Sequence, residues 1–152
     1  MRLVSACLIG INCKWNGKSN CVPKLKELFK RGKLLPICPE QIGGLPTPRN
    51  PSGIFNGIGI DVIEGRCRVV NKKGEDETKQ FLKGAQETLK IIKELGIKKV
   101  ILKKTSPSCG VGKTWQMRRT KRGFKNFLVD GDGVLTALLK RNGVKVISEK
   151  NL

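Results

Sequence analysis

The sequence contains no histidine among its 152 residues. This absence excludes Ser-His-Asp triads, Cys-His nucleophile pairs and every metal site that has a histidine ligand. Proton transfer in any reaction of this protein must therefore use a carboxylate, a lysine, a serine, a cysteine or water.

Acidic residues are scarce, because 12 Asp and Glu stand against 31 Lys and Arg and leave a net charge of +19. Such an excess attracts polyanions, but it also occurs on the well-solvated surfaces of lysine-rich proteins. The positive residues are spread along the chain, and the one dense run consists of Arg118, Arg119, Lys121 and Arg122. This run is either a solvated loop or a contact for nucleic acid, and the composition leaves both interpretations open.

Long apolar runs are also missing. No stretch reaches the roughly 18 consecutive apolar residues of a membrane helix, and the N-terminus lacks the pattern of a secretory signal. We therefore expect a cytoplasmic protein with no membrane partner, and its length is that of one domain, residues 1–152. Cysteines in the cytoplasm stay reduced, so the six cysteines are candidate metal ligands or catalytic thiolates rather than disulfides.

Strand and helix patterns alternate along the chain. Apolar, partly β-branched segments predict strands at residues 2–6, 34–37, 98–103 and 144–148. Apolar residues at helical spacing predict helices at residues 22–31, 75–95 and 134–141. Residues 60–63 and 66–70 alternate around Glu64-Gly65 and predict a hairpin, whereas the many Pro and Gly residues of segment 38–59 predict an irregular loop.

This alternation predicts an α/β fold of the Rossmann-like kind: a mainly parallel sheet with helices on both faces and long Cys-, Gly- and Pro-rich loops at its carboxyl edge. Ligands of such sheets bind at that edge. Cys7, Cys38 and Cys109 each follow a predicted strand, so we expect all three to reach the same edge.

Three thiolates at one edge can hold a zinc ion or three of the four irons of an iron–sulfur cubane. The chain lacks the CxxC pairs of zinc ribbons and the signature of zinc nucleobase deaminases, but the spacing alone does not decide between the two centres. The remaining interpretation, a buried small hydrophobe, suits Cys67 in its predicted hairpin strand and Cys21 beside a helix start.

Three segments resemble the thiouracil desulfidase family: SACLIGINCKWNG at residues 5–17, PICPEQIGGLPTPR at 36–49 and ILKKTSPSCG at 101–110. Similarity extends to GEDET and FLKGA within residues 74–85 and to GDGVLTALLKRNGVKVISE at 131–149, so it covers most of the chain. The resemblance implies an enzyme that removes sulfur from a thiolated pyrimidine and yields the oxo base and sulfide. It also implies a [4Fe-4S] cluster held by only three cysteines.

Carried over to this sequence, the resemblance points to Cys7, Cys38 and Cys109 as the metal ligands, with Cys13 as the substitute if one of them is wrong. The iron without a protein ligand then acts as a Lewis acid that binds the soft substrate sulfur, and no electron transfer is needed. Glu40 follows Cys38 closely enough to exchange protons with the attacking water and the departing sulfur.

Two serines precede Cys109, and the resemblance favours Ser106 as the second catalytic residue. Ser108 is then a substrate-binding residue, because its hydroxyl can reach the edge of the pyrimidine. Turn capping is the alternative role for both hydroxyls.

The sequence departs from the family pattern in two places. Trp15 stands where relatives usually have a tyrosine, and TWQMRRTKRGF at residues 114–124 replaces a stretch resembling Ile-Tyr-Asp-Gly. We expect the second stretch to rim the pocket, so it bears on the identity of the substrate.

The substrate is therefore expected to be a small thiolated pyrimidine, as a base or nucleoside, or a thiolated tRNA, with the 2-thio and 4-thio forms both open. We expect the enzyme to be a monomer with a hydrolase-like action on the C=S bond. The alternative is a basic nucleic-acid-binding module that contains zinc or no metal and catalyses nothing.

Overall fold

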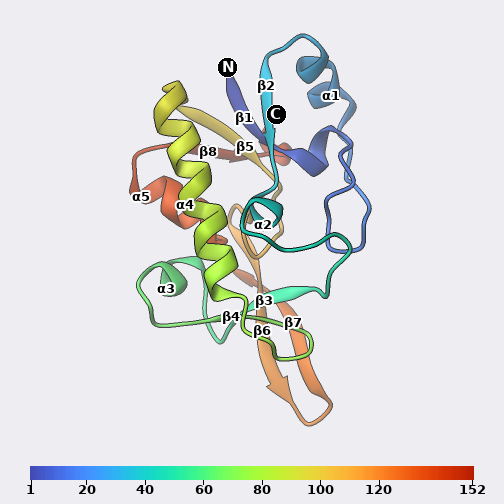
Figure 1. Ribbon diagram of the computed structural model, residues 1–152, viewed down its shortest axis with the longest axis vertical. Helices are drawn as coiled ribbons and strands as arrows, with labels where there is room; N and C mark the ends of the chain where they lie inside the picture. The colour runs from blue at the N-terminus through green and yellow to red at the C-terminus, as the bar shows by residue number, and fades with distance from the viewer.

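The computed structural model describes residues 1–152 and contains two four-stranded sheets (Figure 1). The first sheet is parallel throughout, in the order β2-β1-β5-β8, and its strands are β1 (Arg2–Ser5), β2 (Leu34–Ile37), β5 (Lys99–Leu102) and β8 (Lys145–Ser148). The second sheet has the order β4-β3-β6-β7, and its strands are β3 (Ser52–Phe55), β4 (Val69–Asn71), β6 (Lys113–Thr120) and β7 (Gly123–Asp130). Within it, β3 and β6 are parallel and the other pairs are antiparallel.

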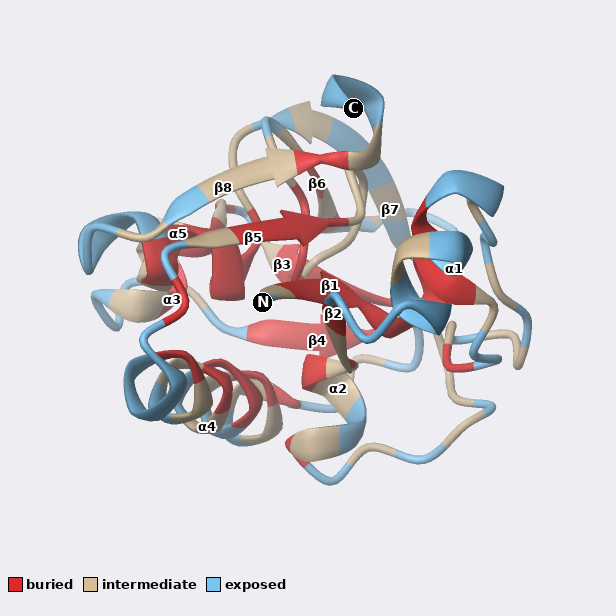
Figure 2. Cartoon of the chain, turned by 90° about the horizontal axis from the view of Figure 1, so that it is seen from above, coloured by how far each residue is buried: buried red, intermediate tan, exposed pale blue.

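Helices cover both faces of the first sheet. The helices of the protein are α1 (Pro23–Lys30), α2 (Pro39–Ile42), α3 (Gly59–Ile63), α4 (Thr78–Leu95) and α5 (Val134–Arg141), with short 3-10 helices η1 (Ala6–Ile9) and η2 (Glu149–Asn151). Buried side chains of the central strands point alternately to the two faces of the sheet: Leu3 and Val100 pack with α4 and α5, whereas Val4 and Ile101 pack with α1. Strands β1 and β5 are accordingly buried over most of their length (Figure 2). None of the helices is both long and apolar enough to cross a membrane.

The local sequence explains where several helices begin and end. Pro23 and Pro39 occupy the first turns of α1 and α2, where a missing N–H removes no hydrogen bond. Gly96 ends α4 with a φ of 62°, a left-handed conformation that glycine adopts without steric cost.

The predicted α/β fold is confirmed, as are the four strands of the first sheet and the helices that became α1, α4 and α5. The predicted hairpin at residues 60–70 is wrong. Its first half is the helix α3. There the Asp61 carboxylate accepts a hydrogen bond from the Ile58 N–H at 2.9 Å, and its Oδ1 atom forms an ion pair with Nη2 of Arg66 at 2.8 Å. Only β4 is a strand there, and Cys67 lies in the turn before it.

Segment 38–59 was also expected to be irregular, and this is only partly correct. It contains α2 and β3, four residues each, which are too short to show a periodic pattern in the sequence. The basic run, expected as a loop if it is solvated, lies at the end of a long hairpin instead. β6 and β7 pair over eight residues each, from Lys113 opposite Asp130 to Thr120 opposite Gly123, and the hairpin extends away from the rest of the protein (Figure 1).

Helices α2 and α4 contact each other backbone to backbone at two glycines. A Cβ on Gly84 would lie 2.0 Å from the carbonyl oxygen of Pro39, and a Cβ on Gly43 would lie 2.0 Å from that of Gln80. Any side chain at either position must therefore push α2 away from α4.

Replacing Gly84 with alanine is expected to destabilise the protein, although alanine is usually favoured over glycine inside a helix by about 0.8–1 kcal/mol. Overpacking of this kind costs roughly 1–3 kcal/mol, and the blocking atoms are backbone atoms that cannot rotate away. Chemical denaturation measures the effect, with Lys83→Ala on the exposed side of α4 as the control. A Gly84→Ala protein as stable as the wild type would show that the two helices separate at little cost.

Candidate active site

A cavity of about 740 Å³ opens beyond the carboxyl ends of the parallel strands. Residues that follow β1, β2 and β5 line one side of it, and residues of the β6–β7 hairpin line the other. The carboxyl edge of the sheet is therefore where the fold gathers its polar and sulfur-containing side chains, as the sequence predicts.

Four cysteines line this cavity: Cys7, Cys13, Cys38 and Cys109. Cys7 lies in η1 directly after β1, Cys38 directly follows β2, and Cys109 lies in the turn region after β5. The predicted meeting of these three residues is confirmed, and Cys13 joins them. Cys21 and Cys67 do not line the cavity.

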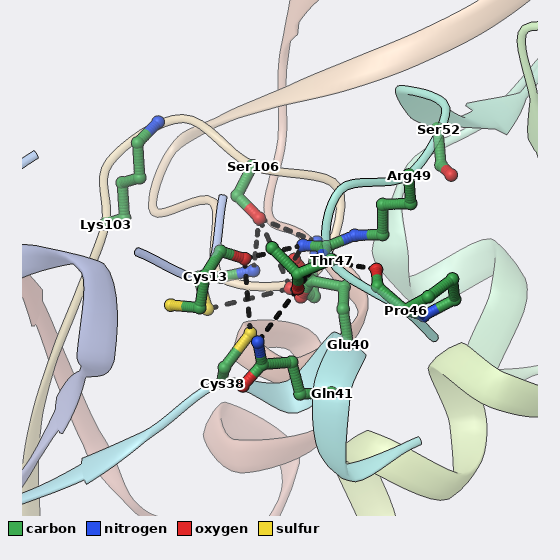
Figure 3. Close-up of polar contacts among 12 residues, drawn as sticks. Cys13, Cys38, Glu40, Gln41, Pro46, Thr47, Arg49, Ser52, Lys103 and Ser106 are labelled. Atoms are coloured by element: carbon green, nitrogen blue, oxygen red, sulfur yellow. Dashed lines mark hydrogen bonds and ion pairs between the residues drawn. The ribbon is translucent and has the colours of Figure 1, made fainter. Parts of the chain in front are cut away.

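The cysteines are close to one another as well as buried. The Cys38 thiol contacts the carbonyl oxygen of Cys13 at 3.8 Å (Figure 3). Cys7 and Cys13 belong to one buried cluster, and Cys38 packs against it. Cys7 is 7% exposed, Cys13 3% and Cys109 5%, so bulk water reaches these sulfurs only through the cavity.

Burial and crowding keep three of these thiols protonated. The contact with the Cys13 thiol and burial raise the pKa of Cys38, and burial together with the charge of Glu40 raises the pKa of Cys109. For Cys13, the contact with Cys38 lowers the pKa, but the contact with Cys7 and burial outweigh it and raise the pKa to about 12. These thiols must therefore lose their protons when they bind a cationic centre as thiolates.

Glu40 is a mostly buried carboxylate with defined partners rather than an exposed loop residue. Its Oε2 atom lies 3.1 Å from Nη2 of Arg49, and the side chains of Glu40 and Arg49 are 13% and 6% exposed. Its Oε1 atom accepts a hydrogen bond from the Ser108 hydroxyl. The same Nη2 atom of Arg49 donates to the carbonyl oxygen of Cys13 at 3.0 Å, so one guanidinium connects the carboxylate with the cysteine loop (Figure 3).

The two serines extend this network. The Ser106 hydroxyl oxygen accepts hydrogen bonds from the backbone N–H groups of Ser108 at 3.1 Å and Cys109 at 3.0 Å, and lies 3.2 Å from the Ser108 hydroxyl oxygen. Because these two amides already donate to Ser106, its hydroxyl hydrogen is free to point toward Ser108. Ser108 in turn donates to Glu40, so the three side chains form a chain of hydrogen bonds. The turn-capping role of Ser106 is thus present, and it fixes the hydroxyl within this chain.

The residues fit a cluster better than a single ion. No group of three or more Cys, Asp or Glu side chains is arranged to hold one metal ion. A zinc ion needs all of its sulfur ligands about 2.3 Å away, whereas the irons at the corners of a cubane take thiolates that stand farther apart. Soft thiols around a cavity of this size match the ligand preference of iron–sulfur clusters.

The hairpin forms the far wall of the cavity, as expected for the stretch at residues 114–124. Trp115, Met117, Phe124 and Asn126 line it from neighbouring positions on β6 and β7, and Arg122 lies at the tip. Trp15, the other departure from the family pattern, also lines the cavity and is 47% exposed.

Arg49 is a site residue that the sequence patterns did not predict, although it ends the segment PICPEQIGGLPTPR. An arginine inside a Pro- and Gly-rich segment that also contains a carboxylate was the available signal, because a buried arginine needs an acidic partner. Lys103 is a second such residue: it lines the cavity and donates hydrogen bonds from Nζ to the carbonyl oxygen of Thr105 at 2.6 Å and to its hydroxyl at 3.2 Å.

Comparisons with known proteins agree with this geometry. Residues 3–151 match the family model of 2-thiouracil desulfurase. The chain is 42% identical to the Bacillus subtilis (strain 168) protein YbbK, called uncharacterized, over 152 residues, which is 100% of this chain and 97% of YbbK. The solved structure of the [4Fe-4S]-dependent thiouracil desulfidase TudS (DUF523Vcz) is 37% identical with a TM-score of 0.82, and the match covers 99% of this chain and 91% of that one.

The family model spans nearly the whole chain and includes all four cavity cysteines, Glu40 and both serines. The resemblance found in the sequence is therefore confirmed: this protein belongs to the 2-thiouracil desulfurase family.

Proposed function

We propose that this protein removes sulfur from a thiolated pyrimidine by hydrolysis of the C=S bond, using a [4Fe-4S] cluster bound by Cys7, Cys38 and Cys109. The observation that carries this proposal is the meeting of these three strand-end cysteines with a partnered Glu40 in one cavity. The name of the solved relative, a [4Fe-4S]-dependent thiouracil desulfidase, supports both the cofactor and the reaction.

When bound, the cluster supplies an iron without a protein ligand, a Lewis acid suited to a soft sulfur atom. The chain contributes the surroundings of that iron. The thiolates of Cys7, Cys38 and Cys109 fix the position of the cluster, and the wall formed by Trp115 and Phe124 gives a flat, neutral ring an apolar surface.

The protein groups then handle the protons. Glu40 accepts a proton from the water molecule that attacks the ring carbon, and the Arg49 guanidinium keeps the carboxylate oriented. Ser108 and Ser106 connect Glu40 to the turn that contains Cys109, so a proton can return through them to the departing sulfur. The carbon–oxygen bond forms, the carbon–sulfur bond breaks and hydrosulfide leaves. No electron donor or acceptor is consumed.

The proposed enzyme is one desulfidase-like domain, residues 1–152, that acts in the cytoplasm as a monomer. A net charge of +19 opposes self-association of identical chains, which supports the monomer.

Anaerobic cluster reconstitution followed by a substrate panel tests this proposal. The panel contains 2-thiouracil, 4-thiouracil, their nucleosides and thiolated tRNA, and the readouts are released sulfide and the oxo product. We expect equal amounts of both products from a brown protein in the absence of any reductant. Full cluster loading without sulfide release from any substrate would contradict the reaction, and a colourless protein would support the non-catalytic module instead.

The basic hairpin favours thiolated tRNA as one substrate. The guanidinium of Arg118 lies over the Phe127 ring at 4.6 Å, and that of Arg119 lies over the Phe124 ring at 5.9 Å. Phe127 and Leu128 are exposed on the edge strand β7, beside the cavity wall. Unpaired basic groups next to exposed apolar side chains suit a polynucleotide, whose backbone is charged and whose bases stack.

Replacing Arg118, Arg119, Lys121 and Arg122 with glutamine is expected to weaken tRNA binding and to flatten its salt dependence. Each phosphate contact that is lost removes roughly 0.9 from the slope of log K against log salt for a duplex, and less for a single strand. Activity on free thiouracil should change much less than tRNA binding, because a neutral ring needs no phosphate contact, although Arg122 also lines the cavity. Binding titrations at several salt concentrations measure the effect.

The matched control replaces the same number of basic residues outside the cavity: Lys24, Lys26, Lys30 and Lys33, all exposed on or next to α1. Equal slopes of log K against log salt for the wild type and the hairpin variant would mean that the basic residues of the hairpin do not bind tRNA. The proposed cluster chemistry would not be affected.

A further inference from the structure

The cavity holds one cysteine more than a cluster with an open iron requires. Three cysteines serve as the proposed ligands, and Cys13 is the fourth. It is 3% exposed, it packs in the same buried cluster as Cys7, and its carbonyl oxygen lies 3.8 Å from the Cys38 thiol. A group so close to two cluster ligands lies beside the cluster itself.

The loop of Cys13 is anchored at its backbone, and the residue lines the cavity. The Cys13 carbonyl oxygen accepts a hydrogen bond from Arg49 at 3.0 Å, and its N–H donates to the Ile11 carbonyl oxygen at 2.9 Å. Residues 11–14 belong to no helix or strand, so the thiol can change rotamer without breaking a ladder of hydrogen bonds. A change of the χ1 angle of Cys13 would therefore move the sulfur while the backbone of the loop stays in place.

We propose that Cys13 is an exchangeable fourth ligand, which closes the open iron of the cluster while the cavity contains no substrate. This inference rests on the proposed function. To bind, the Cys13 thiol releases its proton to solvent, and a sulfur–iron bond forms as solvent leaves that iron. When a thiolated pyrimidine enters, its sulfur takes over the iron, the bond to Cys13 breaks and the thiolate regains a proton. No electron is transferred in either direction.

Ligand chemistry explains both halves of the exchange. Iron in a sulfide cluster prefers soft sulfur ligands, so a neighbouring thiolate displaces water readily. A thiol tethered beside the iron acts at an effective concentration in about the millimolar range, which favours closure when substrate is absent. The thiocarbonyl of the substrate is also a soft ligand and gains ring contacts with the cavity wall, so it can displace the thiolate.

The consequence to be measured is protection of the cluster, since an iron without a protein ligand is the one that oxidation removes. The reconstituted wild type, the Cys13→Ser variant and a Cys21→Ser control are treated briefly with ferricyanide in the absence of substrate. Electron paramagnetic resonance detects the three-iron product, and iron analysis counts the loss. We expect Cys13→Ser to lose its fourth iron at least about tenfold faster than the other two proteins, as an intramolecular ligand at millimolar effective concentration implies.

Two results would overturn the inference. Equal rates of iron loss in Cys13→Ser and the wild type would make Cys13 a bystander, and a Cys13→Ser protein that binds no cluster would make it a permanent ligand. The proposed function fails differently, because it requires sulfide release from thiouracil by the loaded wild type. A protected cluster without sulfide release would therefore contradict the reaction alone, and sulfide release with equal iron loss would contradict the role of Cys13 alone.

Discussion

Replacement of Glu40 with glutamine is expected to slow sulfide release by roughly 10²–10⁴-fold while the cluster stays bound, because the amide keeps the size of the side chain but cannot accept the proton. The amide oxygen can still accept the hydrogen bond from Ser108, so the serine chain remains in place. Sulfide release from thiouracil by protein with a verified iron content measures the effect.

The same substitution also removes the acidic partner of Arg49, whose side chain is 6% exposed. Breaking a buried pair from one side costs about 3–5 kcal/mol, so the thermal midpoint should fall as well, and activity must be compared well below it. Glu87→Gln on α4 is the control, because that carboxylate pairs only with Lys90 near the surface. Wild-type turnover by Glu40→Gln would mean that the attacking water is activated by the iron rather than by this carboxylate.

Removal of a cluster ligand is expected to have the larger effect. Alanine at Cys7, Cys38 or Cys109 should abolish cluster binding, since each deletes a thiolate ligand and no histidine exists to replace it. Cys67→Ala should keep the cluster, because Cys67 lies outside the cavity, in the turn before β4. Iron and sulfide content after anaerobic reconstitution measure both expectations.

Circular dichroism of the cluster-free proteins shows whether they are folded, which is needed because Cys109 is 5% exposed and part of the larger core. Equal iron content in all four variants would reject this ligand set. Cluster binding by Cys7→Ala but not by Cys13→Ala would replace Cys7 with Cys13 in the set and would also reject the exchangeable role of Cys13.

Local sequence patterns were sufficient to predict the parallel sheet and the position of the cysteines that follow its strands. An apolar strand that runs directly into a cysteine-containing turn is visible around Cys7 and Cys38 without any knowledge of the partner strands. The second sheet was not predictable in this way. Its parallel pair joins Ile54 to Gln116, and both strands follow segments dominated by glycine, proline or charge, so the pairing depends on contacts that are distant in sequence.

Most of the predicted site residues line one cavity for the same local reason, whereas Ser108 is 1% exposed, does not line it and donates to Glu40 instead. The contacts between these residues could not be predicted from the sequence. Ser108 and Glu40 are 68 positions apart, and their hydrogen bond exists because β5 and β2 flank β1 in the same sheet. The pairing of Arg49 with Glu40 requires the chain between them to fold back over the cavity. Neither contact could be predicted from the periodicity or the composition of the sequence.

The spacing of the proposed ligands has a consequence for the biogenesis of the protein. Cys7, Cys38 and Cys109 follow three neighbouring strands, and the strand before Cys109 lies beyond the middle of the chain. A nascent chain from which β5 has not yet emerged therefore presents no complete ligand set. Motifs that gather their cysteines within a few residues differ in this respect. The sheet must form first, and the cluster must then enter a folded protein past the β6–β7 hairpin. Chains made faster than the cell supplies clusters would accumulate folded and colourless rather than misfolded, ready for later maturation.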